Sequence, residues 1–129
     1  MIKSPAATRV ALLLSLLAIP LAYVLTLART VVYGDPTEYT FVANILGIAH
    51  PPGYAFFTLL GKLFQTLVPF GEIPWRMHLL AATAATAGAL FAFGTVRETA
   101  RVLFVGQARG LSPNWATAAA VFAALSVAF

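Results

Sequence analysis

The feature that most constrains this chain is an uncharged run of 19 residues from Val10 to Ala28. At 1.5 Å per residue, a helix of that length measures roughly 28 Å, close to the ~30 Å hydrocarbon core of a bilayer. Lys3 and Arg9 precede the run, and Pro20 inside it predicts a kink. A cleaved signal peptide is the alternative, but its apolar region is usually shorter than this run. We therefore expect an uncleaved first transmembrane span.

Composition supports a membrane protein over a soluble domain. The chain is 60% hydrophobic and 9% charged, whereas soluble domains carry about 25% charged residues. It has no cysteine, which excludes a disulfide framework and a thiolate site. The net charge of +4 comes from basic residues that are scattered or flank apolar runs. Because they form no basic stripe, we expect no nucleic-acid partner, and the charges are typical of membrane flanks.

Two further spans are expected, at about residues 77–96 and 114–129. The second contains a run of small residues, Ala81 to Gly88, which permits close packing against other transmembrane helices or subunits. The third is cut off at Phe129, inside an apolar run. We therefore expect residues 1–129 to be one membrane domain, the N-terminal part of a longer protein. A complete small subunit is the alternative.

The distribution of basic residues predicts an orientation. With a cytoplasmic N-terminus, five basic residues lie inside (Lys3, Arg9, Arg97, Arg101 and Arg109) and three lie outside (Arg29, Lys62 and Arg76). An excess of positive charge on the cytoplasmic side is typical of membrane proteins. We therefore expect an integral protein of the plasma (inner) membrane, with the loop of residues 29–76 on the outer face.

The outer loop begins with a predicted helix. Asp35 should be its N-cap, Pro36 its first residue and Glu38 the reciprocal partner in a capping box. The helix should run to about Ile48, because a residue such as His50 before a proline is pushed to extended geometry. On a helical wheel Glu38 falls on the apolar side, where an apolar surround should raise its pKa.

A second helix of the loop is predicted from Tyr54 to Phe70. Its polar residues (Tyr54, Thr58, Lys62 and Gln65) form a stripe, and most of its large apolar residues face the other way (Phe56, Phe57, Leu60, Leu63, Phe64 and Leu67). About 16 residues before Pro69 are a little short for a span. The pattern favours an interfacial helix in the membrane plane. A span with Lys62 inside the protein is the alternative.

The residues that carry possible chemistry gather in this loop. Asp35 and Glu38 are either a simple capping box or a pair suited to acid–base catalysis. His50 begins a rigid His-Pro-Pro-Gly turn, and a lone loop histidine is more often a turn residue than a catalyst. The other histidine, His78, is 28 residues away, so we predict no metal site and no cofactor. Arg76 is either a membrane anchor or a contact for a lipid phosphate.

The order of these features resembles the DUF2723 family of membrane glycosyltransferases, which are similar to protein O-mannosyltransferases. The residues that carry the resemblance are Gly34 to Glu38, Leu46 to Tyr54 with its His-Pro-Pro-Gly-Tyr element, and Pro74-Trp75-Arg76 before the second span. The sequence departs from the family pattern at Pro36-Thr37, Ala55 and His78.

The resemblance implies the start of a C-type glycosyltransferase fold. The expected architecture is an all-α membrane protein, with three transmembrane helices and two interfacial helices in the first outer loop. The implied activity is transfer of a sugar from a polyprenyl-phosphate carrier, held among membrane lipids, to an acceptor on the outer face. Asp35 and Glu38 would be catalytic, and His50, Tyr54 and Arg76 would bind substrate. The alternative is a non-catalytic subunit that packs in a larger membrane complex.

Overall fold

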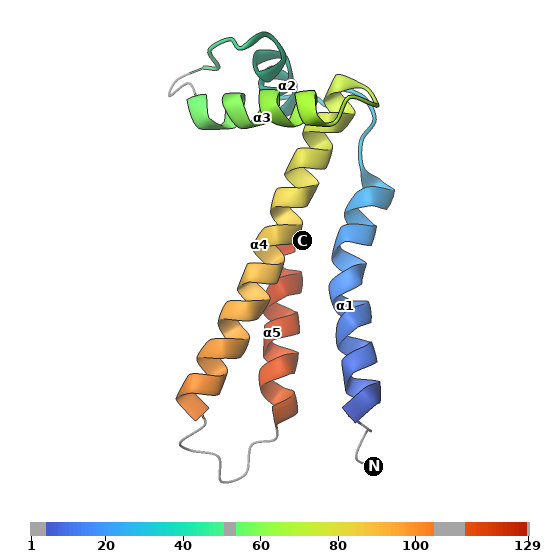
Figure 1. The fold of residues 1–129 in the computed structure, drawn as a ribbon, viewed down its shortest axis with the longest axis vertical. Helices are drawn as coiled ribbons and strands as arrows, with labels where there is room; N and C mark the ends of the chain where they lie inside the picture. Colours follow the sequence, from blue (N-terminus) through green and yellow to red (C-terminus); the bar gives the residue numbers. More distant parts are fainter. Residues whose placement is uncertain (1–4, 51–53, 105–112, 129) are drawn as a thin grey trace. The chain divides into compact units, whose positions relative to one another are not determined.

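The computed structural model describes residues 5–50, 54–104 and 113–128. Within these ranges the chain forms five helices and no strand: α1 (Pro5–Thr26), α2 (Asp35–Ile45), α3 (Ala55–Leu67), α4 (Ile73–Phe104) and α5 (Pro113–Ala128) (Figure 1). The predicted all-α class is confirmed.

Of the helices in the described ranges, α4 alone is long and apolar enough to cross a membrane. Its apolar part, Ile73–Thr99, has 27 residues and a mean hydropathy of 1.7. The helix predicted over residues 77–96 is therefore present. It begins earlier, because Pro74 is tolerated in a first helical turn. The apolar parts of α1 and α5, Leu12–Thr26 and Thr117–Ala128, are shorter. Three spans thus remain a prediction.

The chain divides into two compact units, residues 1–23 with 83–129 and residues 24–82. The first unit is held by one apolar cluster from α1, α4 and α5. Its buried members are Ile19, Ala89, Ala124 and Ala128, with Leu16, Tyr23, Phe93 and Leu125 packed against them. Alanines at these positions let the helix backbones approach closely. The hydroxyl of Tyr23 donates a hydrogen bond to the carbonyl of Ala128.

The second unit packs α2, α3 and the first turns of α4 (Figure 1). Its core contains Ala43, Met77 and Leu80, with the rings of Phe57 and Phe64 and the side chain of Leu60 against them. His78 on α4 shares a hydrogen bond of 2.9 Å, from its Nδ1, with the carbonyl of Ala28. This bond ties the segment before α2 to α4.

The polar stripe of α3 points into the second unit, and apolar side chains cover its outer side. Thr58 and Gln65 are buried, and Lys62 is half-buried. The exposed positions are Phe56, Leu59, Leu63 and Leu67. The prediction that these large apolar side chains share the face away from the polar stripe was wrong for Phe57, Leu60 and Phe64. These three pack against the core of the second unit.

The length of α3 excludes the alternative in which this helix crosses the membrane. Its 13 residues measure about 20 Å, too short for a bilayer. The helix ends at Leu67, before Pro69 and not at Phe70 as predicted.

Candidate functional site

The site begins with the first turn of α2, which starts without a side-chain cap. Gly34 occupies the N-cap with φ 98°, a left-handed conformation that favours glycine, and Asp35 and Pro36 are already helical. The prediction that Asp35 is the N-cap was wrong, because the glycine turns the chain one residue earlier. The predicted capping box is also absent, because the carboxylate of Glu38 binds elsewhere.

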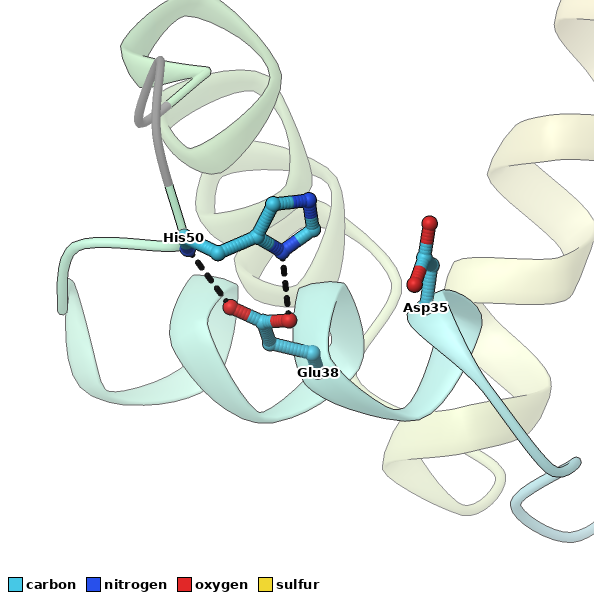
Figure 2. A group of neighbouring side chains, drawn as sticks. All are labelled: Asp35, Glu38 and His50. Carbon is cyan, nitrogen blue, oxygen red and sulfur yellow. Dashed lines mark hydrogen bonds and ion pairs between the residues drawn. The ribbon is translucent and has the colours of Figure 1, made fainter.

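Glu38 holds His50 by two hydrogen bonds, an arrangement we call the Glu38–His50 clasp (Figure 2). The backbone N–H of His50 donates to Oε1 over 2.7 Å, and the ring Nδ1 donates to Oε2 over 2.6 Å. Leu46, in a left-handed conformation with φ 55°, ends α2 and turns the chain back toward its first turn. The predicted helix end near Ile48 was therefore wrong; α2 ends at Ile45.

The clasp sets the electrostatics of both partners. The hydrogen bond from the His50 backbone, and next the bond from its ring, hold the pKa of Glu38 below its ordinary value. The same side-chain bond, and then the negative charge of Glu38, raise the pKa of His50. The predicted upward shift for Glu38 was wrong in direction. Its side chain is 37% exposed and accepts two hydrogen bonds, which outweigh desolvation.

Asp35 lies beside the clasp, one helical turn before Glu38 (Figure 2). Its side chain is exposed, and within the described part of the chain no hydrogen bond reaches its carboxylate. Each of Asp35, Glu38 and His50 offers one ligand atom, and these atoms all lie within 4.8 Å of one another. A divalent cation could be held there in only two ways. Either the Nδ1 of His50 would give up its bond to Glu38, or the imidazole ring would turn its Nε2 toward the carboxylates.

Two tyrosines flank this group. Tyr54, a predicted site residue, is the N-cap of α3 with φ 44°, and its ring lies 6.1 Å from that of His50. Tyr39 follows Glu38 on α2, and its ring contacts both of those rings. Sequence reasoning missed Tyr39. The available signal was an aromatic residue directly after the acid. The predicted Pro-Pro-Gly turn, residues 51–53, lies outside the described residues.

Arg76 is engaged elsewhere in the second unit. Its guanidinium donates to carbonyls in the last turn of α3 and in the segment after it: Nη1 to Gln65 at 3.1 Å, Nη2 to Pro69 at 3.2 Å, and Nε to Phe70 and Gly71 at 3.1 and 2.9 Å. Among the described contacts, none joins Arg76 to the acids. The structure thus brings together four of the five predicted site residues: Asp35, Glu38, His50 and Tyr54.

Comparison with known proteins adds family evidence for most of the chain. Residues 35–129 match the family model described as the N-terminal domain of protein O-mannosyl-transferase TMEM260. The matched region begins at Asp35 and so includes every residue of the site.

Two curated relatives agree with that family match. Protein O-mannosyl-transferase TMEM260 of Mus musculus is 45% identical over 74 residues, 57% of this chain and 10% of the mouse protein. The Dictyostelium discoideum protein of the same description is 33% identical over 76 residues, 57% of this chain and 9% of that protein. The matched part is therefore a small fraction of each relative. No solved structure matches this chain significantly.

Proposed function

We propose a function from the premise that this chain belongs to the family of TMEM260 N-terminal domains. It is related to protein O-mannosyl-transferase TMEM260, a membrane glycosyltransferase. The proposed activity of the intact protein is transfer of a sugar from a polyprenyl-phosphate carrier to a hydroxyl of an acceptor on the outer face of the membrane. Mannose is the first sugar to test, because both relatives are described as mannosyltransferases.

The proposed setting is the plasma membrane, with a cytoplasmic N-terminus and three spans. The loop of residues 29–76 then lies outside, and α2 and α3 rest in the interface. Support comes from α4, which is long enough to span, and from the exposed apolar side chains on α3, Phe56, Leu59 and Leu63. An amphipathic helix with such a face binds at the boundary of head groups and acyl chains.

The observation that carries the proposal is the exposed carboxylate of Asp35 beside the Glu38–His50 clasp, which accepts no hydrogen bond from any residue that the structure describes (Figure 2). An exposed carboxylate without a hydrogen-bond donor can accept a proton from a substrate hydroxyl. Glu38 suits this role less well, because its oxygens are already occupied and its pKa is lowered by His50. Asp35 is therefore the proposed general base, and Glu38 holds His50 in place.

The proposed reaction balances as a single displacement. The acceptor oxygen forms a bond to the anomeric carbon while its proton passes to Asp35. The bond between that carbon and the phosphate oxygen breaks, and its electron pair leaves with the polyprenyl phosphate. His50 contacts Glu38, which raises its pKa, and in its protonated form it can offset charge on the leaving phosphate. The ring of Tyr54 lines the same place.

Arg76 is the second candidate for the phosphate. A guanidinium has five N–H groups, and its bonds to carbonyls use one on Nε, one on Nη1 and one on Nη2. Counting the bonds to described residues, two N–H groups therefore remain for an anion. In this proposal the carbonyls hold the guanidinium rigidly and the remaining N–H groups meet the phosphate.

The test compares Asp35→Asn with Glu38→Gln in the intact protein, with polyprenyl-phosphate mannose as donor and an acceptor peptide. Loss of a general base should lower kcat by about 10²–10⁴-fold in Asp35→Asn. Its thermal stability should stay near that of the parent, because the Asp35 carboxylate makes no hydrogen bond among the described residues. Glu38→Gln should lower stability as well as activity. Glu72→Gln, an exposed acid of the same unit, is the control. Full transfer activity in Asp35→Asn would overturn the proposal.

A further inference from the structure

Tyr39 has more aromatic neighbours than any other described residue near the site. Its ring centroid lies 5.9 Å from that of His50, 5.3 Å from that of Tyr54 and 5.6 Å from that of Phe57. The contacts with Tyr54 and Phe57 are edge-to-face, at interplanar angles of 84° and 73°. This geometry is favourable for ring pairs, because the positive edge of one ring meets the negative face of the other. Tyr39 therefore joins α2 to the loop after it and to the start of α3.

Tyr39 and Glu38 hold the same histidine by different means. Glu38 accepts hydrogen bonds from the backbone N–H and the Nδ1 of His50. These bonds do not cover the faces of the imidazole ring. The ring of Tyr39 contacts the imidazole ring. Two consecutive residues of one helix thus contact the imidazole, one by hydrogen bonds and one by its ring.

The backbone conformation of Tyr54, at the start of α3, also depends on its contact with Tyr39. Its φ of 44° is a left-handed conformation that non-glycine residues rarely adopt. Such a conformation persists only where surrounding contacts determine it. The contacts at hand are the edge-to-face pair with Tyr39 and the ring of His50.

We propose that Tyr39 is a positioning residue of this site, which holds the rings of His50 and Tyr54 against the clasp and so orders the place where Asp35 meets substrate. Tyr39 acts through its neighbours and does not itself take part in proton transfer. Its effect on catalysis rests on the proposed glycosyltransferase function; its effect on the clasp does not.

Amide hydrogen exchange tests the effect on the clasp directly. A peptide covering residues 47–54 contains Pro51 and Pro52, which have no amide hydrogen. The amide of His50 is therefore one of few that the peptide reports, and it is the amide bonded to Glu38. In the intact protein, Tyr39→Leu should speed exchange of this amide on the order of tenfold. Tyr39→Phe keeps the ring and should retain most of the protection. Glu38→Ala, which removes the acceptor of this bond, gives the scale of full loss.

The matched control is Phe41→Leu, which changes an aromatic residue on the same helix whose side chain is exposed and lies outside the ring group. Its exchange at His50 should equal that of the parent. If Tyr39→Leu does not fold, Tyr39→Met fills the space with a side chain that has no ring. The exchange rate of the His50 amide is then measured in that variant. Parent-like exchange at His50 in the folded Leu or Met variant would overturn the proposal.

Activity gives the second reading. Tyr39→Leu should lower kcat for sugar transfer by about 10- to 100-fold, as expected when catalytic groups are displaced. Tyr39→Phe, which keeps the ring, should retain most of the parent's kcat. A parent protein without any transfer activity would count against the proposed function, whereas the exchange reading would still decide the role of Tyr39. Faster exchange with unchanged kcat would limit Tyr39 to the structure of the loop and would overturn its role in the site.

Discussion

The α-carbon of Gly61 on α3 lies so close to Ala43 on α2 that a methyl group added there would stand 2.9 Å from the Ala43 Cβ. The same methyl would stand 2.9 Å from the Cε of Met77 on α4. Methionine can move, but the Cβ of Ala43 is fixed to the backbone of its helix. The absence of a side chain at residue 61 therefore sets how closely α2 and α3 can pack.

We expect Gly61→Ala to destabilise the protein. Overpacking costs about 1–3 kcal/mol, and the gain in helix propensity returns only about 0.5–1 kcal/mol. Gly88→Ala is the matched control, because a Cβ there meets no atom within 4 Å and only the propensity gain applies. Thermal unfolding in detergent measures both. A Gly61→Ala variant as stable as Gly88→Ala would contradict the observed packing.

The Glu38–His50 clasp should depend on pH in a defined direction. The pKa of Glu38 is lowered, so its contribution is complete above the ordinary value of 4.5 and is lost as pH falls through the lowered pKa. The pKa of His50 is raised, so its contribution is complete below the ordinary value of 6.5 and is lost as pH rises through the raised pKa. The clasp should therefore stabilise most between 4.5 and 6.5.

The measurement is the difference in Tm between the parent and Glu38→Gln across that range and beyond it on both sides. The difference should be largest inside the window and shrink at higher and lower pH. Glu72→Gln should show no such maximum. A difference that is flat with pH would mean that the clasp carries no ionic contribution.

The role of Arg76 can be separated into support of the fold and binding of substrate. Arg76→Lys keeps the charge but cannot reproduce a fork that reaches the carbonyls of Gln65, Pro69, Phe70 and Gly71. We expect a loss of about 1–3 kcal/mol in unfolding free energy. Arg97→Lys, an exposed change on α4, should have little effect. A raised KM for the lipid-linked donor at unchanged stability would indicate that phosphate binding is its main role.

The proposed topology predicts which positions are accessible from outside the cell. This chain has no native cysteine, so single cysteines report unambiguously within it. Tyr33→Cys and Thr66→Cys, both at exposed positions, should react with a membrane-impermeant maleimide in intact cells. Arg97→Cys should react only after permeabilisation. Labelling of residues 33 and 97 from the same side would exclude the proposed path of α4 through the membrane.

Much of the helix order was predictable because it depends on local signals. Uncharged runs, Pro36 and Pro74 near helix starts and Pro69 after a helix end mark where helices begin and stop. The direction of the polar stripe on α3 was less accessible. Periodicity shows that Thr58, Lys62 and Gln65 share a face, but it does not show whether that face meets water or protein. The bond from Lys62 Nζ to the carbonyl of Asn44, at 2.6 Å, resolves this for the described chain.

The site itself was predictable in its members more than in its contacts. Acids near a histidine loop indicated Asp35, Glu38 and His50. The pairing of Glu38 with His50 depends on Leu46 in a left-handed conformation, which residue propensities do not favour. The same reversal brings Tyr39 to His50 and Tyr54. The error in the direction of the Glu38 pKa followed from this missing contact, since an apolar helix face was taken as its whole environment.

Three polar contacts of the second unit join residues that are close in sequence. Glu38 and His50 are 12 positions apart, Asn44 and Lys62 are 18, and Gln65 and Arg76 are 11. Closing a flexible loop costs only about 0.6 kcal/mol more for each doubling of its length, so loops this short are among the least costly to close. Folds dominated by such local contacts also form fast. The parts of the candidate site can therefore come together early, once the ribosome has synthesised the chain as far as Arg76.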